Sequence, residues 1–208
     1  MGLTPVPDEQ VATVVTTLEM RAAPPRRPLP EAPLALQRWP APDLAKYRAL
    51  FARVGAPWLW FSRLAMDDAA LAAIIHDPAI EVSAVLDRGR IEVGMLELDF
   101  RAEGACEVSY FGLVPELAGR GHGRWLMAHA LAQAWRPDVG RVWVHTCTLD
   151  HPRALGFYRA QGFVAVKRTV ETFADPRLSG LLPEDAAPHV PLLSRRQATT
   201  AASTPASR

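Results

Sequence analysis

Hydrophobic positions along the chain follow two periodicities, and these divide it into strands and helices. Alternating or β-branched runs predict strands at 11–20, 34–39, 105–114, 141–148 and 163–173, and a hairpin over 81–101. Apolar residues at helical spacing predict helices at 42–55, 66–76, 121–135 and 151–161. Several strands with a helix pair inserted early, followed by alternating helices and strands, predict an α/β sandwich with a mixed sheet.

Length and composition predict one folded domain. The chain has 208 residues, of which 49% are hydrophobic and 22% charged, and these values are ordinary for a domain with its own core. Several of the 19 prolines lie in an extended connector at about 22–33. The apolar segment 186–193 is expected to dock back onto the domain, whereas 194–208 is polar, patternless and expected to be disordered. We therefore expect a single domain over 1–193 and a short tail.

Charge and cysteine content narrow the expected environment and partners. A net charge of +1 is too small to attract a nucleic acid or a membrane surface through the overall field of the protein. No apolar run approaches the roughly 20 residues of a membrane span, and the first residues lack the pattern of a secretory signal. Because the only cysteines are Cys106 and Cys147, no disulfide framework is expected. We expect a cytoplasmic protein that binds neither nucleic acid nor membranes.

A glycine-rich segment, GRGHGR at 119–124, joins a predicted strand to the following helix. Bare amides at the start of a helix, with Arg120 and Arg124 beside them, suit a pyrophosphate. The segment lacks the lysine and hydroxyl of a P-loop, and Arg124 occupies the third glycine position of a dinucleotide fingerprint. A tight turn without a ligand is the alternative, although one glycine would suffice for it. The pattern therefore favours an anion site of another class.

The surrounding segment LVPELAGRGHGRWLM resembles the acetyl-CoA-binding turn of the GNAT superfamily of N-acetyltransferases. Gly121 and Gly123 match the two small positions of the family's Gln/Arg-x-x-Gly-x-Gly/Ala core. Ala118 stands where the leading Gln or Arg is usual, so we expect weaker framing of the pyrophosphate unless a neighbouring arginine compensates. The resemblance implies that the pyrophosphate is bound by Gly119, Arg120, Gly121, His122, Gly123 and Arg124.

A second segment downstream, HPRALGFYRAQGF, resembles the family's Asn-x-x-Ala-x-x-x-Tyr-x-x-x-Gly-Phe motif. Ala154, Tyr158 and the pair Gly162–Phe163 are in register, whereas His151 replaces the usual asparagine. The two motifs occur in the family's order, and the resemblance covers roughly 82–173. It implies a mixed, mostly antiparallel central sheet of about six to seven strands, about four flanking helices, and a splayed strand pair that binds the cofactor.

The resemblance also implies how acetyl-CoA is held. The strand end Leu113–Val114 is placed against the thioester and pantetheine, where a backbone N–H can stabilise the carbonyl oxygen. His151 and Ala154 belong to the cofactor site, and Tyr158 matches the tyrosine assigned as general acid toward the leaving sulfur. Because a thiol has a pKa near 8.5 and tyrosine one near 10, full proton transfer is uphill by about 2 kcal/mol. We therefore expect Tyr158 to donate a hydrogen bond to the thiolate.

A base for the acceptor is harder to assign from the sequence. An alkyl ammonium must lose a proton before it attacks, which requires a carboxylate or an ordered water. Glu97 and Asp99 share one face of a predicted strand, and Glu107 lies on the next strand. We prefer Glu107 as the catalytic base because its strand runs toward the thioester. The alternative is that all three are ordinary solvent-facing carboxylates.

Aromatic residues after the first predicted helix, Trp58, Trp60 and Phe61, lie where the family builds its variable acceptor pocket. Such walls favour an apolar or aromatic amine, or a cationic one through cation–π attraction. The alternative is that they cap the core. His145 is expected to contact the substrate or relay a proton, with a hydrogen-bonded core histidine as the alternative.

The segment HTCTLDH at 145–151 contains four side chains that could bind a metal. His145 and Cys147 would point the same way along a strand, which suits a ligand pair. However, no second cysteine and histidine cluster accompanies them, as a zinc site would require. We therefore expect no metal.

Together these inferences indicate an N-acetyltransferase that transfers an acetyl group from acetyl-CoA to a primary amine of a small molecule or peptide, by direct attack in a ternary complex. The departures at Ala118 and His151 keep open a second hypothesis, a non-catalytic module that binds or senses CoA or acyl-CoA. The glycine segment does not match the dinucleotide-binding fingerprint, which argues against a dinucleotide-dependent oxidoreductase. The final strand, 163–173, offers an edge for homodimerisation, which is frequent in the family.

Overall fold

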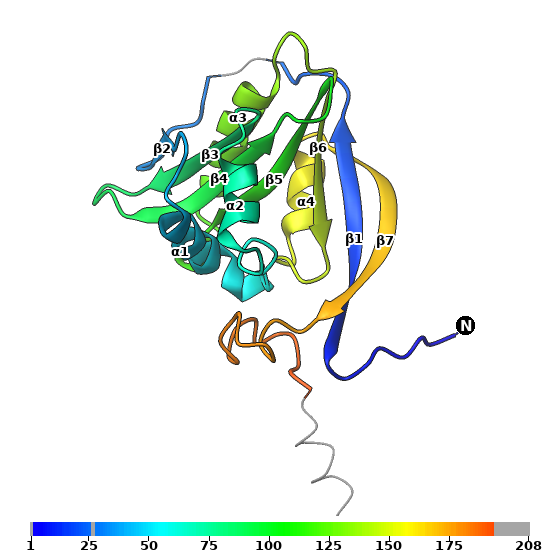
Figure 1. The fold of residues 1–208 in the computed structure, drawn as a ribbon. Helices are drawn as coiled ribbons and strands as arrows, with labels where there is room; N and C mark the ends of the chain where they lie inside the picture. Colours follow the sequence, from blue (N-terminus) through cyan, green and yellow to red (C-terminus); the bar gives the residue numbers. More distant parts are fainter. Residues whose placement is uncertain (1, 26–27, 194–208) are drawn as a thin grey trace, which may run out of the picture.

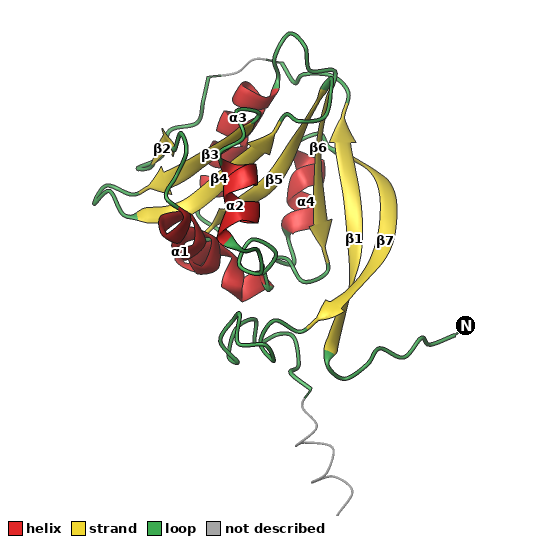
Figure 2. Ribbon diagram, viewed as in Figure 1, coloured by secondary structure: helices red, strands yellow, loops and turns green. Residues whose placement is uncertain are grey.

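Seven strands form one twisted sheet with helices on both faces (Figures 1 and 2). The computed structural model describes residues 2–25 and 28–193. The strands are β1 (Gln10–Met20), β2 (Ala35–Arg38), β3 (Ile80–Leu86), β4 (Glu92–Asp99), β5 (Ala105–Leu113), β6 (Arg141–Cys147) and β7 (Val164–Ala174). The helices are α1 (Leu44–Gly55), α2 (Asp68–Ile75), α3 (His122–Ala134) and α4 (Ala154–Ala160). Short 3-10 turns lie at Ala56–Trp58 and Pro115–Leu117.

The strand order is β2-β3-β4-β5-β6-β1-β7, and every neighbouring pair is antiparallel except β5 and β6. This confirms the predicted mixed, mostly antiparallel sheet with about four helices. The sequence did not show where the first strand lies. β1 sits between β6 and β7 and pairs with both, so the two ends of the described chain meet in one half of the sheet.

The two N-terminal helices begin at aspartate caps. The Asp43 carboxylate accepts a hydrogen bond from the Lys46 amide (2.9 Å), and Asp67 accepts one from Ala70 (2.8 Å). Each cap satisfies an amide that the helix leaves without a partner. α1 ends at Gly55, where a Cβ would lie 2.4 Å from that of Trp60. The glycine therefore allows the aromatic segment after α1 to fold back onto the sheet.

β5 and β6 separate along their length. Their parallel pairing covers only Ala105–Glu107 against Arg141–Trp143, although both strands continue well beyond it. The register between β4 and β5 shifts so that Ser109 has no partner, which is a β-bulge. Bulges bend a strand away from its neighbour. The splayed strand pair expected from the sequence is therefore present.

The main core lies between the sheet and its helices. A second, smaller apolar cluster lies where β1 begins and β7 ends. Its buried members are Val11, Leu59, Leu149, Leu182 and Ala187. The last two belong to residues 175–193, hereafter the C-terminal segment, which lies below the sheet in Figure 1. Arg177 holds the segment in place through a buried ion pair with Asp175 (2.7 Å) and hydrogen bonds to two of its carbonyls. The predicted tail, 194–208, lies outside the described residues.

Within the described residues, no helix is both long and apolar enough to cross a bilayer.

Candidate active site

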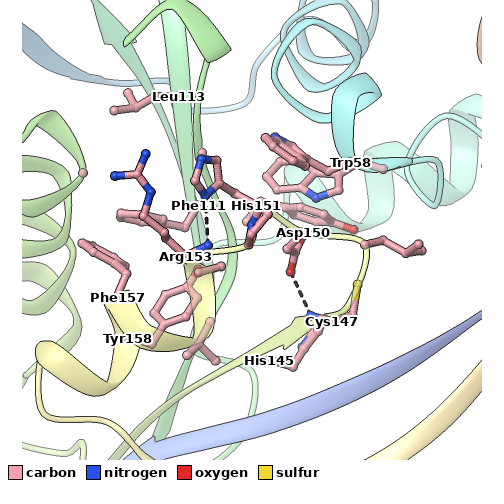
Figure 3. A pocket seen from close by; sticks show the side chains of 18 of the residues that line it. Trp58, Phe111, Leu113, His145, Cys147, Asp150, His151, Arg153, Phe157 and Tyr158 are labelled. Carbon is pink, nitrogen blue, oxygen red and sulfur yellow. Dashed lines mark hydrogen bonds between the residues drawn. The ribbon is translucent and has the colours of Figure 1, made fainter. Parts of the chain in front are cut away.

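A cavity of about 910 Å³ runs from the start of α3, across the gap between β5 and β6, to β1 and β7 (Figure 3). Its walls come from the turn before α3, from β5 and β6, and from the loop and helix that follow β6. On the far side lie β1, β7 and the aromatic loop 58–62 between α1 and α2. The cavity therefore joins both predicted sites, the anion turn and the acceptor pocket.

The turn before α3 has the geometry of an anion site. Gly119 and Gly121 have φ of +77° and +82°, a region that side-chain-bearing residues avoid. Gly121 caps α3 without a side-chain hydrogen bond, and the Arg124 amide bonds the Gly121 carbonyl (3.0 Å), so the amides of His122 and Gly123 are left for a ligand. Nη2 of Arg124 lies only 3.6 Å from where a Cβ of Gly121 would stand, so the guanidinium covers the turn.

The cavity wall includes only some of the predicted pyrophosphate residues. Ala118, Gly119, Gly121, Gly123 and Arg124 line it, whereas the side chains of Arg120 and His122 do not. The difference follows from helix geometry, since α3 begins at His122 and successive side chains point in different directions. Arg124 is thus the arginine placed to compensate for the small side chain at 118.

The backbone of β5 supplies donors to the gap, but not at Val114. The Val114 amide donates to the carbonyl of Val93 (2.9 Å), and its side chain is buried in the core. Of the two residues of the expected strand end Leu113–Val114, Val114 thus has its amide already bonded within the sheet. Because N–H groups alternate in direction along a strand, the amides of Leu113 and Phe111 point away from β4 and into the gap.

Tyr158 lies on α4 beside this gap. Its ring packs edge-on against Phe111 (centroids 6.1 Å apart) and Phe163 (5.9 Å). The residue lines the cavity, and no hydrogen bond joins its hydroxyl to another described residue. Burial, with a smaller contribution from the nearby Asp150 charge, raises the pKa of Tyr158 well above its usual value. The hydroxyl therefore stays protonated and is free to donate to a ligand.

The predicted base, Glu107, does not line the cavity; His145 does. The two side chains form a pair, with Nδ1 of His145 3.3 Å from Oε1 of Glu107. The hydrogen bond to Glu107 raises the pKa of His145 despite the opposing effect of burial. Glu107 can therefore reach a cavity ligand only through the imidazole. The pair itself was not foreseen, because a three-residue parallel pairing of β5 with β6 brings it together.

The other two carboxylates considered for this role are engaged elsewhere. Glu97 is fully buried and binds Nη2 of Arg63 (2.6 Å) and the hydroxyl of Tyr47 (2.6 Å). Asp99 forms a two-pronged ion pair with Arg101. Neither of these carboxylates lines the cavity.

The loop after β6 explains the unusual His151. Its Nδ1 accepts a hydrogen bond from the amide of Arg153 (3.1 Å), and its carbonyl accepts one from Ala154 (2.7 Å) just before α4 (Figure 3). An asparagine oxygen can accept the same bond two residues on. His151 thus replaces the family's asparagine in the local turn. Both His151 and Ala154 line the cavity.

Asp150 is held by hydrogen bonds within the same loop. Its Oδ2 accepts hydrogen bonds from the Cys147 amide (2.9 Å) and the Thr146 hydroxyl (2.6 Å). The described part of the chain contains no group of three or more histidine, cysteine or acidic side chains that could hold a metal ion.

The two predicted acceptor tryptophans differ in their roles. Trp60 lines the cavity but packs against Phe51 (5.6 Å) and Tyr110 (5.1 Å), so much of its ring belongs to the core. Trp58 stands beside the rings of His151 (5.4 Å) and His189 (5.8 Å) at the cavity's edge. Trp58 thus forms the part of the wall next to the loop after β6 and the C-terminal segment.

Sequence reasoning missed the residues that β1 and β7 contribute. Thr13 and Val15 of β1, and Glu171 and Phe173 of β7, line the far end of the cavity. No motif marks them, because their position follows from the insertion of β1 between β6 and β7. Alternation within the two strands indicated only which of their residues share a face.

Comparisons with known proteins agree with this geometry. A model of the acetyltransferase (GNAT) family matches residues 47–163, more than half of the chain. A GCN5-related N-acetyltransferase from Sphaerobacter thermophilus has 18% identity and a TM-score of 0.59, over 77% of this chain and 51% of that protein. An aminoglycoside acetyltransferase from an uncultured soil metagenomic sample, solved with trehalose, has 18% identity and a TM-score of 0.52. The match covers 67% of this chain and 93% of that protein.

A conserved protein of unknown function from Staphylococcus epidermidis has 15% identity and a TM-score of 0.50, over 80% of this chain and 63% of that protein. The chain thus spans about half to two thirds of the length of this protein and of the Sphaerobacter enzyme. None of the curated proteins is significantly similar to the chain. At identities this low the structural likeness concerns the fold alone.

The site combines a splayed parallel strand pair, an uncapped glycine turn at one end of the gap and a tyrosine at its side. With the match over 47–163, the chain belongs to the GNAT family of acetyltransferases, whose members typically use acyl-CoA.

Proposed function

We propose that the protein is an N-acetyltransferase that transfers an acetyl group from acetyl-CoA to a primary amine of a small molecule or peptide in a ternary complex. The observation that carries this proposal is the continuous cavity, which connects the uncapped start of α3 with the Tyr158 hydroxyl and the His145 imidazole. Such a cavity has room for a nucleotide-linked donor at one end and an amine at the other.

The residues present fit a CoA-type donor. The bare amides after Gly121 and the guanidinium of Arg124 suit a pyrophosphate. The outward-facing N–H and C=O groups of Phe111 and Leu113 offer the pantetheine amides the hydrogen bonds of a missing strand. When bound there, acetyl-CoA would supply an acetyl thioester, whose carbonyl carbon accepts the amine.

Groups of the chain itself can assist acyl transfer at the carbonyl oxygen, the leaving sulfur and the attacking nitrogen. The amide of Leu113 or Phe111 donates to the carbonyl oxygen as it gains negative charge. The Tyr158 hydroxyl, kept protonated by burial, donates to the sulfur as it leaves. His145, when neutral, takes a proton from the attacking nitrogen, and Glu107 orients the ring and stabilises the imidazolium that forms.

Direct attack fits the state of Cys147, the nucleophile that a two-step mechanism would need. Burial and the charge of Asp150 raise the pKa of the Cys147 thiol. A thiol that stays protonated is a weak nucleophile.

The proposal is tested by adding acetyl-CoA to the purified chain. We expect saturable binding by calorimetry, a higher Tm, and release of free thiol that depends on an added amine. If acetyl-CoA neither binds nor raises Tm at millimolar concentration, the proposal is wrong. If acetyl-CoA binds but no member of a broad amine panel is acetylated, the chain is instead a CoA-binding or CoA-sensing module.

A further inference from the structure

The two ends of the cavity differ in charge. The arginines that line it, Arg124 and Arg153, both belong to the donor end, one at the start of α3 and the other just before α4. Two acidic residues line the cavity: Asp150, whose carboxylate is hydrogen-bonded within the loop after β6, and Glu171 on β7, which lies at the acceptor end. The Glu107 carboxylate stands behind His145 on the same face of the sheet. The acceptor end is therefore anionic whenever His145 is neutral.

Glu171 is an exposed residue of β7 that lines the cavity. It lies opposite Thr13 of β1, and the Thr13 side chain is buried and bonded to Thr148 (2.9 Å). Within residues 2–25 and 28–193, no hydrogen bond or ion pair engages the Glu171 carboxylate. It lies close enough to His145 for its charge to raise the pKa of that imidazole.

Apart from Thr13, the side chains that line the cavity near Glu171 are apolar and aromatic. Phe173, two residues further along β7, packs against Phe61 with ring centroids 4.8 Å apart. Val15 of β1 and Leu149 complete this side, and Leu149 is buried against the C-terminal segment. His189 of that segment bonds the Leu149 carbonyl (3.2 Å), which fixes the wall. A carboxylate among such walls selects a cation attached to an apolar body.

The register of the sheet sets the distance between His145 and Glu171. His145 lies opposite Thr17 of β1, and Glu171 lies opposite Thr13, so the two are two strands and four residues apart. Strand geometry places their backbones roughly 16 Å apart. Because both side chains reach into one cavity, a ligand that touches both spans on the order of 10 Å.

We propose that the acceptor carries two cationic groups on an apolar or aromatic body: the amine that is acetylated beside His145 and Tyr158, and a second cation that pairs with Glu171. This inference rests on the proposed function, because it concerns the acceptor end of the same cavity. It makes Glu171 a specificity-determining residue that takes no part in the acyl transfer itself.

The probes are α,ω-diaminoalkanes of increasing length, each compared with the n-alkylamine of the same carbon count. Binding of each probe to the protein saturated with CoA is measured by calorimetry, and turnover by thiol release from acetyl-CoA. For the wild type we expect a diamine that spans about 10 Å to bind roughly tenfold more tightly than its monoamine, with the preference falling at high salt. Glu171→Gln should abolish that preference by weakening diamine binding.

Glu103→Gln is the matched control, because Glu103 is an exposed carboxylate in the turn between β4 and β5 and does not line the cavity. It should keep the diamine preference, and the Tm increase with acetyl-CoA shows that each variant is folded. Equal binding of diamines and monoamines by the wild type, or a preference that survives Glu171→Gln, would overturn the inference while leaving the acetyltransferase proposal intact. The absence of acetyl-CoA binding or of any amine-dependent thiol release would instead refute the proposed function.

Discussion

At the scale of single residues, the two departures from the family motifs have different consequences. His151 keeps the local turn through its Nδ1 acceptor, so the loss of asparagine leaves the start of α4 intact. Ala118 lines the cavity with no more than a methyl group, and the Arg124 guanidinium covers the turn. Tyr158 was predictable because a motif marks it, whereas Glu171 was not, because only the three-dimensional pairing of β7 with β1 brings it to the site.

Tyr158→Phe tests the hydrogen-bond donor to the leaving sulfur. Because the buried hydroxyl stays protonated, its loss should lower kcat by about 10²-fold, the usual effect of removing one donor from developing charge. The affinity for acetyl-CoA should change little, since the phenyl ring still packs against Phe111 and Phe163. Steady-state kinetics beside calorimetry separate the two effects. An unchanged kcat would remove Tyr158 from the mechanism.

Glu107→Gln tests the imidazole pair. The carboxylate favours the protonated ring, so the pKa of His145 should lie above its ordinary value in the wild type and fall in the variant. NMR titration of the His145 ring protons measures both. Protonation of His145 removes the base, so the turnover rate of the wild type should rise as the pH passes through the pKa of His145. In Glu107→Gln that rise should occur at lower pH, because the pKa of His145 is lower. An identical pKa in both proteins would show that the pair is not formed in solution.

At the scale of elements, the aromatic loop after α1 is held by a buried polar network. Arg63, just after the loop, binds Glu97 of β4, which also accepts from Tyr47 of α1. The network joins helix, loop and sheet, and it explains why Glu97 serves structure and not catalysis. Sequence alternation placed Glu97 on the correct strand, but could not show that α1 and the loop would cover it.

Glu97→Ala should therefore destabilise the fold strongly. Removing the carboxylate leaves the Arg63 charge buried without its partner, which costs about 3–5 kcal/mol. Urea unfolding measures the change. Glu103→Ala, at an exposed turn, should stay within about 0.5 kcal/mol of the wild type. A similarly small effect for Glu97→Ala would mean that the network does not form.

The turn before α3 is tested by restoring the family's leading side chain. Ala118 is extended (φ −64°, ψ 145°) and lines the cavity, so an arginine there can reach a pyrophosphate. Ala118→Arg should tighten acetyl-CoA binding about tenfold, because one hydrogen bond to a charged group contributes about 1.5 kcal/mol. Calorimetry gives the Kd. An unchanged Kd would indicate that the pyrophosphate does not bind at this turn.

At the scale of the whole molecule, the elements and their order were largely predictable, and the completed cavity was not. Periodicity located the strands and helices, and two motifs indicated the donor end. The acceptor end combines β1 and β7, which are far apart in sequence and carry no shared motif, and its wall at Leu149 packs against the C-terminal segment. The outer edge of β7 has no partner strand among the described residues, and Val164, Val166 and Val170 are exposed on it. Homodimerisation through this edge stays a prediction.

The central claim, acetyl transfer to an amine, is tested most directly by mass spectrometry of an amine incubated with acetyl-CoA and the purified chain. The account predicts an acetylated amine, formed in step with free CoA thiol and strongly reduced by Tyr158→Phe. Acetyl-CoA that binds saturably but yields no acetylated product across cationic, apolar and peptide amines would contradict it.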